Sequence, residues 1–236
     1  MFKSLSIGVL ALLLAACGAL KGRHPAPPGP AESVPQPGLP PGRMYRVDEN
    51  QSELRILVYR AGPLAHFGHN HVIVNHAVRG AVSLAAAPGG SVFWLKVPVA
   101  GFVVDDPQAR REEGPDFAGD IPDDAKSGTL HNMLSAALLN ADAFPEITVN
   151  RVAASAAQDR SGAGALTVTV AIGVAGHESK VDVPLTLSVE SRGLSATGTL
   201  ELRQSVLGLT PYSLMLGALQ VQDAMTIKFN IVAVPE

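Results

Sequence analysis

The chain has 236 residues, of which 47% are hydrophobic and 17% are charged, as is typical of a globular protein. A formal net charge of −3 and an aromatic content of 5% offer no basic or stacking surface for nucleic acid. The single cysteine excludes an intramolecular disulfide and a zinc module built on cysteine pairs.

Residues 1–16 have the pattern of an export signal. Lys3 gives a positive start, and residues 5–14 are almost wholly apolar but too few to span a bilayer. The segment ends in LAAC (residues 14–17), which resembles a bacterial lipobox. We therefore expect residues 1–16 to be a lipoprotein signal peptide and Cys17 to be acylated, with palmitate among its acyl chains. These chains would anchor the protein to a membrane. The alternative is an ordinary secretory signal that leaves Cys17 a free thiol.

Residues 17–43 are expected to form a tether between the lipidated cysteine and a folded domain of residues 44–236. Eight of the 18 prolines lie between Pro25 and Pro41, mixed with Gly and Ala. Proline fixes φ and removes backbone donors, so this stretch predicts an extended, semi-rigid spacer. Gly18, the residue after the cysteine, favours the outer membrane over the inner membrane.

After Met44, apolar and polar residues alternate with a period of two, which indicates half-buried antiparallel strands. Turn signals such as Gly176-His177 and Arg192-Gly193 separate them. Many short strands at this spacing favour an all-β barrel or sandwich, and closure removes unpaired edges. We predict a closed or nearly closed antiparallel up-and-down barrel of about eight strands, similar to a lipocalin.

One segment departs from the strand pattern. Residues Thr129–Leu139 carry apolar side chains at intervals of three and four, which predicts one short helix. The charged, Pro- and Gly-containing stretch Asp105–Lys126 before it predicts a long loop.

The faces expected to point inward are aliphatic, and bulky aromatic side chains are scarce among them. This favours an apolar ligand cavity, although a plain aliphatic core would show the same alternation. A small barrel of this kind holds side chains only or one small ligand. The expected lumen residues are Leu54, Ile56, Val58, Val168, Val170, Ile172, Leu185, Leu187, Leu200, Ile227 and Phe229.

Several short motifs follow one another between residues 44 and 235. They are YRVD (45–48) before a strand from Ser52, VRG (78–80), the strand 92–104 followed by Asp105, LLNADAFPEI (138–147) after His131, the hairpin 166–187 and LRQSVLGL (202–209). In their order they resemble the YceI-like family of small periplasmic β-barrels that bind lipids or polyisoprenoids. The chain departs from the family pattern at Val206-Leu207, where an acidic-aromatic pair is usual, and in the long acidic loop after Asp105. The resemblance implies an elongated barrel that wraps a long isoprenoid or amide-bearing lipid tail.

Histidines cluster near the start of the domain, at His66, His69, His71 and His76. His69 and His71 would share one face of a strand and could hold a metal ion, with His131 as a third ligand. The favoured alternative places His66, His69, His71 and His131 at the mouth of the barrel, where imidazoles shape a loop or contact a lipid headgroup.

The sequence therefore predicts a lipid-anchored, periplasm-facing envelope protein, most consistent with the outer membrane, whose barrel carries a polyisoprenoid or related lipid. The alternatives are a histidine metal-binding protein and a structural lipoprotein with a filled barrel. No Gly-x-Ser-x-Gly motif or phosphate-binding loop is present, so we expect no enzyme and no cofactor besides a bound lipid. The expected partners are that lipid and the membrane. The sequence does not determine the oligomeric state, and a homodimer is one of the alternatives.

Overall fold

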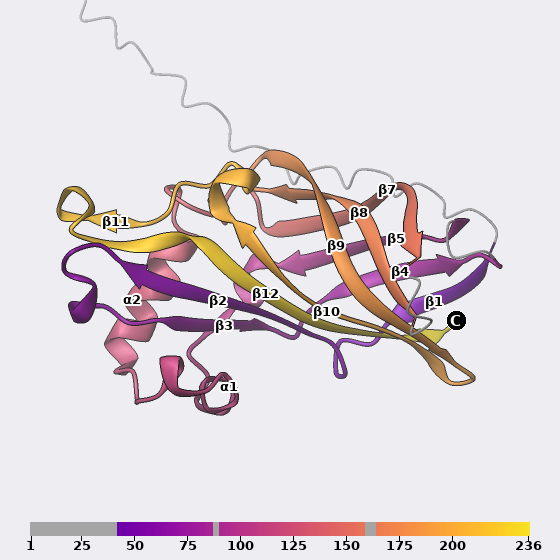
Figure 1. Ribbon diagram of the computed structural model, residues 1–236, viewed down its shortest axis with the longest axis horizontal. Helices are drawn as coiled ribbons and strands as arrows, with labels where there is room; N and C mark the ends of the chain where they lie inside the picture. The colour runs from indigo at the N-terminus through magenta and orange to yellow at the C-terminus, as the bar shows by residue number, and fades with distance from the viewer. Residues whose placement is uncertain (1–41, 87–89, 159–163) are drawn as a thin grey trace, which may run out of the picture. The chain divides into compact units, whose positions relative to one another are not determined.

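The computed structural model describes residues 42–86, 90–158 and 164–236 (Figure 1). The predicted signal peptide, Cys17 and almost all of the tether lie outside these residues. Residues 39–236 form one compact unit, separate from residues 1–38. The described strands of this unit pair with one another, and both hydrophobic clusters lie within it, so we expect it to fold on its own.

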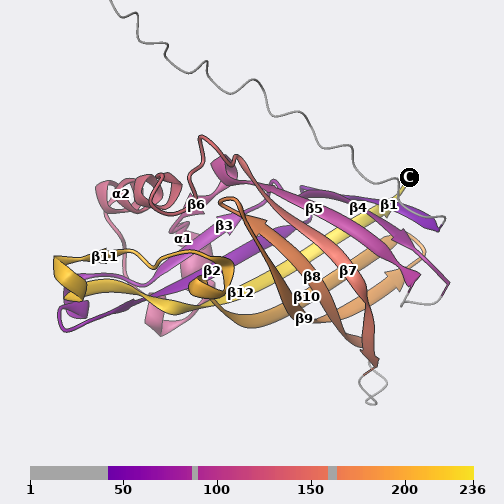
Figure 2. The ribbon, with the colours of Figure 1, turned by 90° about the horizontal axis from the view of Figure 1, so that it is seen from above.

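Within the described residues, eight strands form a closed antiparallel ring, as predicted (Figures 1 and 2). The long strand β12 pairs with β10 on one side and with β1 on the other, through Tyr45↔Pro235 and Val47↔Ala233, and this last pairing closes the barrel. In ring order the strands are β1 (Arg43–Val47), β4 (Arg79–Leu84), β5 (Val92–Pro98), β7 (Glu146–Gln158), β8 (Ala165–Val174), β9 (His177–Glu190), β10 (Gly193–Arg203) and β12 (Leu219–Pro235).

Three further strands extend the wall toward one end of the barrel. Strand β2 (Glu53–Ala61) continues along β12 beyond β1, β3 (His71–Asn75) pairs with β2, and the two-residue β6 (Val103–Val104) pairs with β3. A short β11 (Ser213–Leu214) pairs with β12 at the same end. Figures 1 and 2 place β11 and the second helix at this end, opposite β1 and the C-terminus.

The turns follow from local sequence. Ala175 and Gly176 have φ values of 49° and 81° and join β8 to β9 as a two-residue hairpin between the paired residues Val174 and His177. Positive φ at both central residues matches the twist of the strands they connect. The predicted turn at Gly176 is confirmed by this geometry.

The single predicted helix is wrong in number and in bounds. Two helices lie in the connection between β6 and β7: α1 (Pro107–Glu112) and α2 (Asp123–Leu134). The side chain of Asp106 caps α1 by accepting hydrogen bonds from the amides of Gln108 and Ala109, both at 2.9 Å. The supposed loop therefore contains α1 and the start of α2.

Helix α2 begins six residues before the predicted start at Thr129. Its first turn holds Asp123 and Asp124, whose charges suit the positive end of the helix dipole. It ends at Leu134 because Ser135 adopts extended backbone angles and its hydroxyl donates to the carbonyl of Asn132 at 2.8 Å. Residues 135–139 are therefore turns rather than helix.

Helix α1 covers the outer face of β2 and β3. Leu57, Val72 and Val74 form a small second core there with Ala109 and Phe117. Ion pairs fix this contact: Arg55 meets Glu112 at 2.9 Å and Glu113 at 2.8 Å, and Lys228 meets Glu113 at 2.5 Å. Burial lowers the pKa of the Arg55 guanidinium, but the carboxylates of Glu113 and Glu112 outweigh it and raise that pKa overall.

Candidate functional site: an apolar lumen with a polar mouth

The barrel encloses an apolar cavity of about 260 Å³. Its wall is mostly aliphatic, because most of the inward residues of the strands are Val, Leu or Ile, and Phe93 and Phe229 add aromatic rings. Ten of the eleven lumen residues expected from the sequence line it: Leu54, Ile56, Val168, Val170, Ile172, Leu185, Leu187, Leu200, Ile227 and Phe229. Their position is as expected, and their contact with a ligand stays a prediction.

A second cavity of about 250 Å³ lies toward the β11 and α2 end of the barrel. Val58, the remaining expected lumen residue, lines it. Ile56, Ile147, Ile172, Leu207 and Met225 line both cavities, so the two share one stretch of wall. Helix α2 and the turns after it contribute Met133, Leu138 and Leu139 to the second cavity. Together the cavities form an apolar lumen that reaches from the closed ring toward one end of the barrel.

A cationic side chain, which sequence reasoning missed, lines the first cavity. Arg151 lines the first cavity beside Thr167, and it pairs with Val170 of the neighbouring strand. Burial lowers the pKa of the Arg151 guanidinium. The pairing of β7 with β8 shifts register between Arg151 and Ala153. The sequence did contain a signal for this position. Ile147 and Val149 alternate inward with a period of two, and the same period places Arg151 inward.

Polar residues gather where the second cavity reaches the surface. His69 and His71 line it together with Arg60 and Tyr212, and the two imidazole rings lie 6.1 Å apart. His71 begins β3, and its register partner Val58 is a lumen residue, so its ring is on the inward face. His69 lies in the loop before β3 and is exposed, so the two histidines do not share one strand as predicted.

A buried carboxylate holds His71 in place. The Nδ1 atom of His71 lies 2.6 Å from Oδ2 of Asp105, and the Val72 amide and Arg110 donate to Oδ1 at 3.0 and 2.5 Å. Burial raises the pKa of Asp105, but these hydrogen bonds outweigh it and hold the pKa below its usual value. Asp105 is 1% exposed and has a φ of 56°, a conformation that Asp tolerates better than most residues.

The other histidines lie apart from the cavities. His66 is exposed and its ring lies 3.9 Å from that of Phe67, while His131 is exposed on α2 and lines neither cavity. Among the residues described, no three His, Cys, Asp or Glu side chains are arranged to hold a metal ion. No helix in the described ranges is both long and apolar enough to span a membrane.

Comparison with solved structures supports the fold. BcnA of Burkholderia cenocepacia is similar at a TM-score of 0.58 and 17% identity, covering 80% of this chain and 99% of its own. A polyisoprenoid-binding domain from Saccharophagus degradans, implicated in plant cell wall breakdown, is similar at a TM-score of 0.55 and 12% identity. The match covers 81% of this chain and 98% of that domain. No curated protein matches the sequence. The model of the YceI-like domain matches residues 45–233, and the chain therefore belongs to the YceI-like family.

Proposed function

We propose that the protein is a lipid-anchored envelope protein that binds a long apolar lipid, of the polyisoprenoid class, in its lumen. The observation that carries the proposal is the aliphatic wall shared by the two cavities. Each methylene that leaves water for such a wall contributes about 0.8 kcal/mol, so a long chain binds firmly without polar contacts. The ligand named for the Saccharophagus degradans domain agrees in chemical class.

The lumen also favours a binding protein over the two alternatives from the sequence. A structural barrel with a filled core would leave little space, whereas here cavities of about 260 and 250 Å³ remain. The metal alternative expected His69 and His71 on one strand, whereas His69 lies in the loop before β3. A role in binding rather than catalysis, and a place in the envelope with the anchor at Cys17, complete the proposal.

The test is organic extraction of the purified protein followed by mass spectrometry. We expect a lipid with a long apolar chain at a fixed ratio to protein, and native mass spectrometry should show the same mass bound to the intact barrel. Protein that is free of lipid when purified under native conditions, and that does not take up a polyprenyl phosphate added in detergent-free buffer, would contradict the proposal.

A further inference from the structure

Four large apolar side chains are exposed at the end of the barrel where the second cavity reaches the surface. Phe67 on the turn η1 (Ala65–Phe67) is 68% exposed, Met215 is 74% exposed, and Leu216 is fully exposed on the turn η6 (Met215–Gly217). Leu214 of β11 completes the set, which we call the apolar tip. Isolated exposed apolar residues are ordinary, but a gathered group marks an interaction surface.

The two loops that carry the apolar tip are joined to each other. The amide of Leu64 donates to the carbonyl of Ala218 at 2.8 Å. Gly62 approaches the other loop so closely that an added Cβ would lie 2.6 Å from the Gly217 carbonyl oxygen. The side chains of the two loops are therefore presented together.

The backbone of the second loop adopts an unfavourable conformation at the residues that carry the exposed side chains. Met215, Leu216 and Gly217 have φ values of 49°, 56° and 90° in succession. The left-handed region suits glycine but disfavours residues such as Met and Leu. A loop that needed only to turn could use Gly or Asn, so the large side chains at these strained positions are evidence that their exposure has a use.

The two loops that carry the apolar tip have no acidic side chain of their own. Residues 61–70 and 208–222 contain no Asp or Glu. Arg60 lies at the base of the first loop, where its Nη1 donates to the Gly68 carbonyl at 2.7 Å, and His66 packs on Phe67. The nearest carboxylate along the second loop, Asp223, accepts hydrogen bonds from Ser205. Exposed Leu, Met and Phe beside basic groups match the interface of an anionic bilayer.

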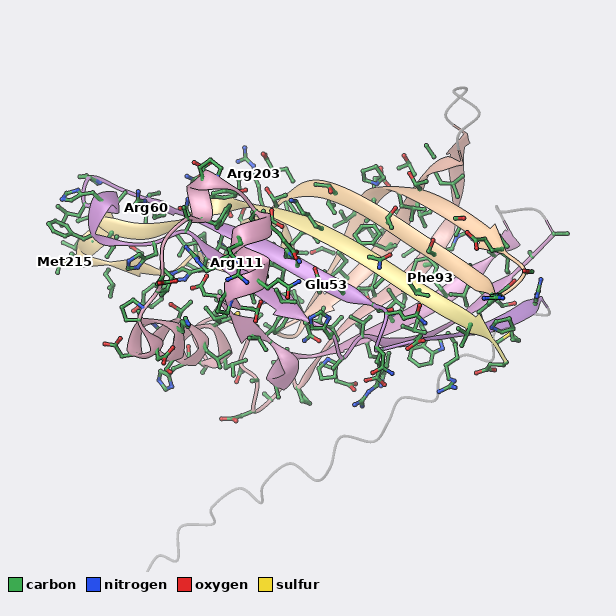
Figure 3. All side chains as sticks on the ribbon, turned by 90° about the horizontal axis from the view of Figure 1, so that it is seen from below. Glu53, Arg60, Phe93, Arg111, Arg203 and Met215 are labelled. Carbon is green, nitrogen blue, oxygen red and sulfur yellow. The ribbon has the colours of Figure 1, made fainter. Side chains whose placement is uncertain are left out.

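We propose that the apolar tip inserts into the interfacial region of an anionic lipid bilayer. Leu214, Arg60 and Gly68 line the second cavity, so the mouth of the lumen lies at this surface, and Figure 3 shows Arg60 and Met215 at the same end. Insertion would bring the mouth against the acyl chains, and a lipid could then move between bilayer and lumen with little exposure to water. This docking goes beyond lipid binding itself and beyond any anchor at Cys17.

The test uses residues 39–236, which lack Cys17 and the leader and form a compact unit. Flotation with vesicles of phosphatidylethanolamine and phosphatidylglycerol should bring the unit to the lipid layer, and phosphatidylcholine vesicles should retain less. Leu216→Ser should weaken the partition coefficient about tenfold, because one buried leucine side chain is lost from the interface. Val103→Ser, which also removes an exposed valine side chain but at a position outside both cavities, should leave the partition coefficient unchanged.

Absence of vesicle binding by the unaltered unit, or equal binding by Leu216→Ser, would overturn the proposal. A dimer in sedimentation that Leu216→Ser dissolves, without vesicle binding, would assign the apolar tip to a second copy instead and likewise overturn it. Lipid extracted from the same samples reports the lumen separately. An empty barrel that still floats would therefore contradict the proposed function but not the docking.

Discussion

His71 and Asp105 are 34 positions apart in the sequence, yet Nδ1 of His71 lies 2.6 Å from Oδ2 of Asp105 behind the mouth of the lumen. The carboxylate is buried and also bonds Arg110, which is itself buried at the start of the helical connection. One carboxylate thus ties the mouth histidine to the helix that covers the outer face of the barrel. We therefore expect the negative charge of Asp105 to hold both His71 and Arg110 in place.

Asp105→Asn should destabilise the protein by about 3 kcal/mol at neutral pH, because it leaves the Arg110 guanidinium buried without its counter-ion. Asn has nearly the same shape and tolerates the positive φ of this position, so the change isolates the charge. Urea unfolding gives the measurement. Asp106→Asn is the matched control, since Asp106 is only half-buried and Asn caps a helix as well as Asp. Equal stability of the two variants would contradict the assignment.

The same pair predicts a pH dependence. Because the pKa of Asp105 is lowered in the folded state, its contribution is fully present above the ordinary carboxyl pKa and is lost as the pH falls through the lower folded value. The difference in unfolding free energy between the unaltered protein and Asp105→Asn should therefore shrink below about pH 4. A difference that stays constant as the pH falls from 7 to 3 would show that Asp105 does not act through its charge.

His71→Gln should loosen the structure around the mouth of the lumen more than His69→Gln does, because of these two histidines only His71 is bonded to Asp105. We expect the retained lipid to fall, or the loop of residues 61–70 to become sensitive to protease, in the first variant. Elemental analysis of the unaltered protein and of a double variant that carries both His69→Gln and His71→Gln should find negligible metal in both. Zinc or copper at a fixed ratio to protein after dialysis against a weak chelator, lost in the double variant, would instead favour the metal hypothesis.

How far the sequence predicts this structure depends on whether the signal is local. The wall strands follow from a period of two that needs no partner, so Val168, Val170 and Ile172 could be placed inward in advance. The bond between His71 and Asp105 exists only after two distant segments meet, and no spacing encodes it. The apolar run at residues 214–216 looks like part of a core strand, and only the positive φ values reveal that it turns outward.

Val170→Phe tests the lumen with an apolar change. Val170 lines the first cavity and is buried, so the larger ring should occupy space that a lipid chain would fill. Overpacking costs about 1–3 kcal/mol, and lipid content measured by extraction should fall by a larger proportion than stability. Val103→Phe, at an exposed position outside both cavities, is the control. Unchanged lipid content and unchanged stability would show that Val170 does not face the bound chain.

Cys17→Ser tests the anchor, on which the proposed place in the envelope depends. The variant should incorporate no labelled palmitate, while thermal unfolding of the barrel stays unchanged because the compact unit begins at residue 39. Acyl chains should hold the unaltered protein on membranes through a high-salt wash, whereas docking at a charged surface is weakened by salt. Leu216→Ser, which keeps Cys17, should therefore still need detergent for release. Unaltered protein that leaves washed membranes without detergent would contradict the lipid anchor.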